Sequence, residues 1–243
     1  APTLQEKWVF GNLPDYVYHN IINQIFLFFK KTSQFNLINY SSEIIKKELQ
    51  ELYINKTIER VKNFSNQINF NVSKPVYINN IKYPPLSEFL KTINGLIQQK
   101  LNNEKLNKLT LMHGDLCFSN ILSDSRSNIV KFIDPRGGLN DSFNSDSKII
   151  GDYRYDIAKF GHSLIGNYDY IVTGFYNLVK NDKELSFNFS LQHPSRDLLN
   201  SYFYTKVKEM NVDVEFIKIS IINLFISMLP LHNEDEDRQI ALL

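Results

Sequence analysis

Residues 111–138 read LMHGDLCFSNILSDSRSNIVKFIDPRGG. Two apolar runs, at 121–122 and 129–133, are rich in β-branched and aromatic residues, and the polar segment SDSRSN between them is typical of a turn. The pattern therefore predicts a β-hairpin. Pairing the two runs would place Asn120, at the start of one strand, near Asp134, at the end of the other.

The polar groups at this end of the hairpin suggest a site for a hard cation. Asn120 and Asp134 offer oxygen ligands, which suit Mg²⁺, an ion that takes one or two carboxylates together with phosphate oxygens and several waters. Asp115 lies just outside this pair. A carboxylate in that position could orient an incoming hydroxyl group and accept its proton.

The order and spacing of these residues resemble a known family. The pattern H-G-D-x-x-x-x-N at 113–120, followed by Ile-Asp-Pro at 133–135, is similar to the catalytic and metal loops of the aminoglycoside phosphotransferase and choline kinase group, which has a protein-kinase-like fold. Gly114, where protein kinases have Arg, points to the small-molecule branch. Residues 151–158, GDYRYDIA, resemble the next helix of that family.

The resemblance implies a role for each of these residues. Asp115 would be the catalytic carboxylate, and Asn120 and Asp134 would hold Mg²⁺ against the phosphates of ATP or GTP. Asp156 would support the catalytic loop without doing chemistry. We expect His113 to hold the loop by hydrogen bonding rather than to act as an acid or a base.

The resemblance also implies a fold and a reaction. The fold would be α+β and mainly helical, a kinase-like C-terminal lobe whose small hairpin carries the catalytic and metal loops. The reaction would transfer a phosphoryl group to a hydroxyl of a sugar, amino sugar or amino alcohol. The sequence looks most like members found with bacterial surface-polysaccharide genes, some of which are fused to a sugar nucleotidyltransferase.

Three further residues have two open interpretations each. Arg136 could reach a phosphate or a substrate anion, or it could pair with Asp152 or Asp156. Glu234 and Asp235 lie in an acidic run near the C-terminus. They could contact the substrate, as acidic residues of the resembled family do with amino sugars or choline, or they could form a solvated helix start, where acids are favoured.

The amino-terminal lobe that usually accompanies this catalytic loop has no counterpart in the sequence. None of the nine glycines forms a G-x-G-x-x-G turn, and no strand of the Val-Ala-Ile-Lys type precedes the loop. Lys82 is the nearest candidate, but it lies too late in the chain. Because the first residue is Ala, we expect 1–12 to be a leading strand, a linker or a remnant of an upstream region, and 13–243 to be the catalytic lobe. An amino-terminal lobe or a fused nucleotidyltransferase domain would then lie upstream.

Composition sets limits on the class of protein. A length of 243 residues with 43% hydrophobic residues allows a sizeable core, and a net charge of +1 gives no electrostatic case for nucleic acid or an anionic membrane. The single cysteine excludes an internal disulfide bond and fits a reducing compartment. We expect no apolar run to approach the roughly 18 to 20 residues of a membrane span. We therefore expect a soluble cytoplasmic protein.

Hydrophobic periodicity predicts the remaining elements. Residues 72–83 are β-like, 139–148 form a loop at the mouth of the site, 168–178 continue as helix or form a substrate wall, and 181–189 are irregular. His162 falls off the apolar stripe of its helix, which predicts a surface or partly packed histidine. The expected helices lie at 15–31, 41–67, 87–101, from 156 onward, at 194–210 and at 213–228, the last of them central because it is nearly apolar throughout.

Two other functional classes remain open. The chain could be a catalytically inactive binding or scaffold module, because the nucleotide-clamping lobe has no counterpart in it. Metal-dependent hydrolysis ranks last, since the hairpin offers too few His and Asp ligands.

Overall fold

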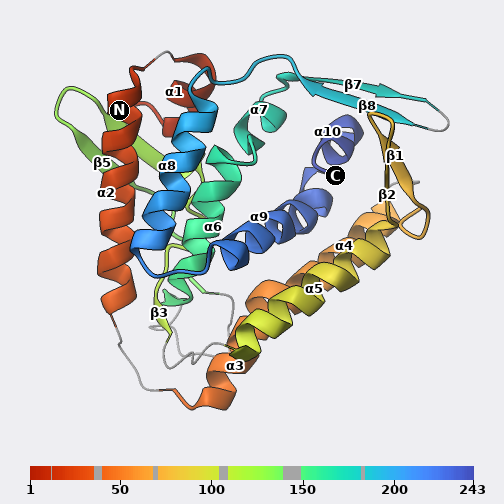
Figure 1. The fold of residues 1–243 in the computed structure, drawn as a ribbon, viewed down its shortest axis with the longest axis horizontal. Coiled ribbons are helices and arrows are strands. Elements are labelled where there is room, and N and C mark those ends of the chain that lie inside the picture. Colours follow the sequence, from red (N-terminus) through yellow and green to blue (C-terminus); the bar gives the residue numbers. More distant parts are fainter. Residues whose placement is uncertain (12, 36–39, 68–70, 104–108, 139–148, 182–183) are drawn as a thin grey trace.

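The computed structural model describes residues 1–243 except 12, 36–39, 68–70, 104–108, 139–148 and 182–183 (Figure 1). The loop expected at 139–148 therefore lies outside the described residues. As expected, the fold is α+β and mainly helical, with small sheets.

The first segment is a helix. α1 (Leu4–Phe10) begins after Thr3, whose hydroxyl accepts a hydrogen bond from the Glu6 N–H while the Glu6 carboxylate accepts one from the Thr3 N–H. Leu4 and Trp8, one turn apart, are both buried in the common core. The expectation of a leading strand or linker here is wrong, because the capping box and this buried face favour a helix.

A long apolar helix lies at the centre of the helical part. α9 (Val214–Met228) contacts α6 (Tyr153–Leu164) on one side and α4 (Lys56–Gln67) and α5 (Leu86–Asn103) on the other (Figure 1). Gly161 permits the close approach of α6, because a Cβ at this position would lie 2.6 Å from a methyl carbon of α9. The central place predicted for this helix is confirmed.

α9 continues into a short 3₁₀ turn, η4 (Leu229–His232). Together they form an apolar helical stretch that is long enough to cross a membrane, so the expectation that the sequence has no such run is wrong. However, 61% of the apolar window is buried inside the fold. This burial is consistent with the core helix of a soluble protein.

The remaining helices include those predicted at 15–31, 41–67 and 194–210. They are α2 (Asp15–Gln34), α3 (Ser42–Gln50), the π-helical segment η1 (Glu51–Asn55), α7 (Tyr168–Val172), α8 (Arg196–Glu209) and α10 (Glu236–Ala241). The helix predicted at 41–67 is formed by α3, η1 and α4. His162 of α6 is 0% exposed, so the expectation of a surface or partly packed histidine is wrong. The rings of Tyr168 and Phe225 pack against it, at centroid distances of 4.2 and 4.3 Å.

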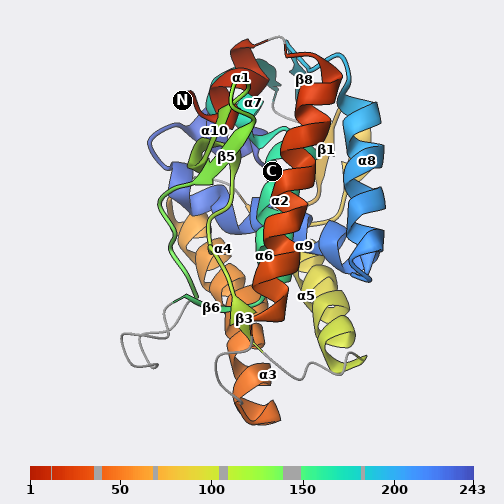
Figure 2. The same ribbon diagram turned by 90° about the vertical axis from the view of Figure 1, so that its left-hand side faces the viewer.

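The predicted hairpin is confirmed. β4 (Ile121–Asp124) and β5 (Ile129–Phe132) pair antiparallel, with Ile121 opposite Phe132. Figure 2 shows this hairpin beside α1 and α2, and the Phe132 ring lies 4.4 Å from the ring of Phe28 in α2. A second antiparallel pair, β3 (Thr110–Leu111) with β6 (Ile150–Gly151), brings together the chain just before residue 113 and just after residue 148.

The other sheet has the strand order β2-β1-β8-β7. Its strands are β1 (Val76–Ile78), β2 (Ile81–Tyr83), β7 (Tyr176–Lys180) and β8 (Leu185–Phe189). The β-like prediction for 72–83 is confirmed. The prediction of an irregular segment at 181–189 is wrong for residues 185–189, which form β8. The reason is visible in β8, whose apolar residues alternate with exposed Ser186 and Asn188 as in a half-buried strand.

Candidate functional site

The turn between β3 and the hairpin has a conformation that requires glycine. Gly114 has φ +82°, and a Cβ on it would lie 2.1 Å from the carbonyl oxygen of Gly137. The N–H groups of Arg136 and Gly137 both donate to the carbonyl oxygen of His113 at 2.8 Å. These hydrogen bonds join His113 to residues 136–137, so the segment after the hairpin packs against the loop that carries Asp115.

Asp156 and His113 hold this loop from within. The fully buried Asp156 carboxylate accepts hydrogen bonds from the backbone N–H groups of His113 at 2.6 Å and Gly114 at 2.8 Å. Burial raises the pKa of Asp156 to about 7, against the opposing effect of these two donors. The His113 ring joins the Asp115 N–H, at 3.3 Å from Nδ1, to the Ile133 carbonyl, at 2.9 Å from Nε2. Both side chains are therefore occupied with backbone groups.

Asp115 lies between two cations. Its Oδ1 is 2.9 Å from Lys159 Nζ and its Oδ2 is 3.1 Å from Arg136 Nε. Lys159 is buried on α6, whereas the Arg136 side chain is 67% exposed. Burial by itself would raise the pKa of Asp115, but Lys159 and Arg136 outweigh it and hold this pKa below its ordinary value. The carboxylate is thus charged at neutral pH.

The backbones of the two expected metal ligands, Asn120 and Asp134, lie close together at the base of the hairpin. The Ile133 N–H donates to the Asn120 carbonyl at 3.0 Å, so Asp134 follows directly from a residue paired with Asn120. The Asn120 side-chain amide donates to the backbone oxygen of Asp115 at 2.8 Å. Its Oδ1 consequently remains as the atom able to bind a cation. Asp134 is exposed.

This donor set fits Mg²⁺ better than a metal bound entirely by protein. Among the described residues, no three His, Cys, Asp or Glu side chains cluster closely enough to hold a metal ion. One amide oxygen and one exposed carboxylate match an ion that keeps several waters and takes its other ligands from phosphate.

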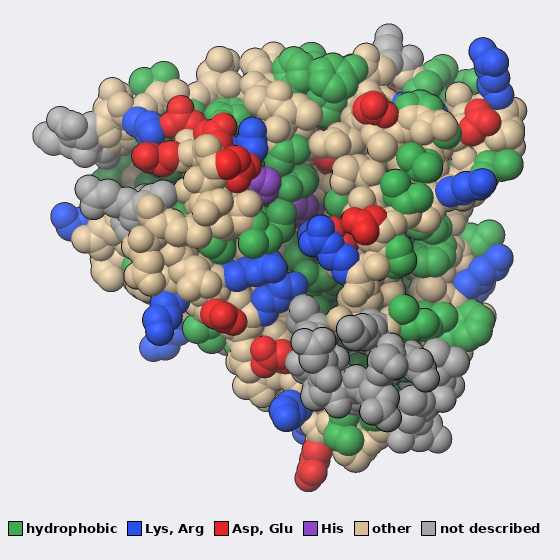
Figure 3. Space-filling view, turned by 180° about the vertical axis from the view of Figure 1, so that it is seen from behind, with side chains coloured by type: hydrophobic (Ala, Val, Ile, Leu, Met, Phe, Trp, Pro, Cys, Tyr) green, Lys and Arg blue, Asp and Glu red, His purple; other side chains and the backbone are tan. Residues whose placement is uncertain are grey.

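A cavity of about 520 Å³ opens beside Asp115. Figure 3 shows this face of the molecule, with Lys and Arg side chains gathered around a hollow and histidine in its wall. The wall is built from the loop residues Gly114, Asp115, Cys117, Ser119, Asn120 and Arg136–Gly138, from Lys56 and Arg60 of α4, from Tyr155 and Lys159 of α6, and from Tyr168, Met228, Leu231 and His232. Asp134 is not among these residues.

The structure rules out one of the two interpretations offered for Arg136. Arg136 pairs with Asp115, so the expected pairing with Asp152 or Asp156 is wrong. Asp152 instead caps α6 and pairs with Arg154 at 2.7 Å. The reason is the contact of the 136–137 backbone with His113, which directs Arg136 toward the loop of Asp115.

Glu234 and Asp235 lie outside the cavity wall. Asp235 caps α10 by accepting a hydrogen bond from the Arg238 N–H, and Glu234 pairs with the Arg238 side chain at 2.6 Å. These contacts match the interpretation as a solvated helix start. His232, from the same tail, does line the cavity and lies 3.1 Å from the Tyr168 hydroxyl oxygen.

Sequence reasoning singled out Arg136 but missed the other three cations of the cavity, Lys56, Arg60 and Lys159. Lys159 follows Asp156 by three residues on one helix, a spacing that places both on one face. Lys56 and Arg60 are four residues apart on a predicted helix and so share a face as well. Those spacings were visible, but nothing in the sequence connected α4 with a loop more than fifty residues later.

Comparison of the chain with protein-family models, with curated proteins and with solved structures finds no significant match. The resemblance to the aminoglycoside phosphotransferases therefore rests on motifs 113–120, 133–135 and 151–158 alone.

Proposed function

We propose that this chain is the kinase-like catalytic lobe of a phosphotransferase that moves the γ-phosphoryl group of ATP or GTP to a hydroxyl of a small molecule. The observation that carries the proposal is the position of Asp115. Its carboxylate is charged and lies at the wall of a cavity of small-molecule size, and its backbone carbonyl accepts a hydrogen bond from the side-chain amide of Asn120.

Each site residue has a task in this reaction. Asp115 orients the acceptor hydroxyl and takes its proton as the acceptor oxygen bonds to the γ-phosphorus. The bond between that phosphorus and the β–γ bridging oxygen breaks, and the nucleoside diphosphate leaves with the electron pair. Asn120 and Asp134 would hold Mg²⁺, which when bound neutralises charge on the phosphates. A base of low pKa suits this chemistry because the transition state is loose and positioning dominates.

The wider setting belongs to the same proposal. The acceptor is a sugar, amino sugar or amino alcohol, and the protein acts in the cytoplasm. Residues 113–158 support these points only through their resemblance to the family.

A catalytically inactive binding module is the alternative. The ion pairs at Asp115 favour it, because Lys159 and Arg136 occupy both carboxylate oxygens that a hydroxyl would approach. In the proposed enzyme, the exposed Arg136 moves away from Asp115 when the acceptor binds.

The test is Asp115→Asn, with Asp197→Asn as a matched control on the exposed first turn of α8. Transfer of ³²P from ATP to a panel of sugars and amino alcohols should fall about 10²- to 10⁴-fold in Asp115→Asn and remain unchanged in the control. Calorimetry with Mg²⁺ and ATP should show unchanged binding for Asp115→Asn and a large loss for Asp134→Ala. Equal turnover of Asp115→Asn and wild type would remove Asp115 from this role. Nucleotide binding without transfer would favour the inactive module.

A further inference from the structure

The charge of the cavity is strongly unbalanced. Among its described lining residues, Lys56, Arg60, Arg136 and Lys159 are cations, and Asp115 is the only carboxylate. His232 adds little charge, since burial lowers its pKa. A cationic acceptor placed in this cavity would be repelled by the surplus positive charge.

Two of the four cations have no carboxylate partner among the described residues. Lys56 Nζ lies 3.3 Å from the Tyr155 hydroxyl, and Arg60 Nη1 donates to the Ser227 carbonyl at 3.1 Å. Burial lowers the pKa of both side chains, and the nearby charge of Arg136 lowers that of Arg60 further, although Glu59 on the adjoining exposed surface opposes this. Partly buried, unpaired cations are unfavourable in the free protein, which is the arrangement expected where an anion binds.

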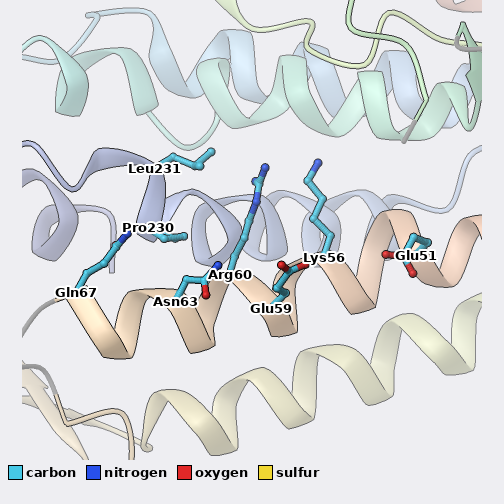
Figure 4. Close-up of a pocket in the computed structure, with 8 residues that line it drawn as sticks. All are labelled: Glu51, Lys56, Glu59, Arg60, Asn63, Gln67, Pro230 and Leu231. Atoms are coloured by element: carbon cyan, nitrogen blue, oxygen red, sulfur yellow. The ribbon is translucent and has the colours of Figure 1, made fainter. Parts of the chain in front are cut away.

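The two side chains converge on one place. Figure 4 shows Lys56 and Arg60 extending side by side from α4 toward α6, whereas Glu59 remains close to α4. They also line a neighbouring groove of about 460 Å³, whose wall includes Leu231 and the carboxylates of Glu51 and Glu59. Lys56 and Arg60, referred to below as the α4 pair, therefore lie where this groove joins the cavity of Asp115.

The proposed Mg²⁺ ligands would place the nucleotide at the hairpin. Of the two residues proposed to hold its Mg²⁺, Asn120 lies in the cavity wall at the start of the hairpin, whereas Asp134 is exposed and does not line the cavity. Phosphates bound there approach Asp115 from the hairpin, and the α4 pair is left for the acceptor.

We propose that the acceptor carries an oxyanion, either a carboxylate or a phosphate ester, which binds to Lys56 and Arg60 while its hydroxyl faces Asp115. The planar fork of Arg60 suits both kinds of oxyanion. The inference rests on the proposed phosphotransferase function and narrows it, because it disfavours the amino sugars and amino alcohols that the family resemblance alone allows.

The experiment compares four matched pyranoses by calorimetry on the whole chain: glucose, glucosamine, glucuronate and glucose 6-phosphate. At least one of the two anionic sugars should bind about tenfold or more tightly than glucose, which corresponds to about 1.4 kcal/mol, and glucosamine should bind no better than glucose. Whether glucuronate or glucose 6-phosphate binds more tightly distinguishes a carboxylate from a phosphate.

Variants assign the preference to the α4 pair. Lys56→Gln combined with Arg60→Gln should abolish it, the charge-preserving Arg60→Lys should retain part of it, and Lys91→Gln on the exposed face of α5 should leave it unchanged. Thermal unfolding of each variant checks that the fold is intact.

Equal binding of all four sugars, or no binding of either anionic sugar, would overturn the proposal. So would a double variant that loses affinity for ATP and Mg²⁺ but keeps its preference for the anionic sugar, because the pair would then serve the nucleotide. If an anionic sugar binds selectively but receives no phosphoryl group, the proposed anion site at Lys56 and Arg60 stands and the phosphotransferase function is refuted.

Discussion

Replacement of Lys159 by Met tests the central ion pair of the site. Lys159 Nζ lies 2.9 Å from Asp115 Oδ1, and both side chains are about one-tenth exposed. Met has a flexible apolar side chain of similar length, so the substitution removes the charge with little change in packing.

The size of the effect follows from the geometry. Two unit charges 2.9 Å apart attract by about 6 kcal/mol at an effective dielectric constant of about 20. In the variant, part of the lost attraction is offset because no lysine charge has to be desolvated on folding. Removing one partner of a buried ion pair typically lowers the free energy of unfolding by about 3 to 5 kcal/mol. Arg136 still pairs with the other oxygen of Asp115. We therefore expect a loss of about 3 kcal/mol in the free energy of unfolding.

Urea unfolding at pH 7.5 measures this loss, and thermal unfolding should show a fall in Tm of about 6 to 12 °C. Lys56→Met is the matched control, because Lys56 lines the same cavity but has no carboxylate partner among the described residues. It should stay within about 1 kcal/mol of wild type. In a double-mutant cycle, Asp115→Asn should relieve about 2 kcal/mol or more of the Lys159→Met loss.

The pH dependence has a defined sign. The pKa of Asp115 is held below its ordinary value of 3.8, so its ion pairs stabilise the fold above that pH and are lost as the pH falls through the lowered pKa. The difference between wild type and Lys159→Met should therefore narrow below about pH 4. A loss under about 1 kcal/mol at pH 7.5, or no relief by Asp115→Asn, would refute the reasoning.

Two further substitutions test the surroundings of the site. Burial raises the pKa of Asp169 to about 7, so the native state binds more protons than the unfolded state between about pH 4 and pH 7 and loses stability as the pH rises. The stability of Asp169→Asn relative to wild type should accordingly grow by roughly 2 to 3 kcal/mol from pH 5 to pH 8 in urea titrations, and a constant difference would contradict this. Gly114→Ala places a Cβ against Gly137 at φ +82° and should destabilise by about 2 kcal/mol or more, whereas Gly95→Ala, whose Cβ meets nothing within 4 Å, should gain about 0.5 to 1 kcal/mol in the same assay. Equal effects of the two glycine substitutions would show that residue 114 tolerates a side chain.

Local patterns in the sequence were enough for most of the elements. The hairpin was predictable because turn residues separate two β-branched runs, and α9 because it is apolar on every face. β8 carried an equally local signal in its alternating residues, and the irregular segment expected there overlooked it. α1 was missed for a different reason. Its Trp-Val-Phe run resembles a strand, and the capping box of Thr3 and Glu6 that precedes this run was overlooked.

The motif at 113–120 was recognisable from its own residues, although Asp156 and residues 136–137 hold the loop in place. Gly114 permits the turn, and Asp156 follows at the start of the next helix. The charge of the cavity has a different origin, because Lys56, Lys159 and Arg136 come from three separate segments. The distances between these charges are set by the packing of the helices around α9. Hydrophobic burial drives that packing but is non-directional, so a sequence pattern does not reveal which charged side chains it brings together. The chain alone thus specified a carboxylate in a glycine turn, whereas the assembled helices decided that the carboxylate faces a positively charged cavity.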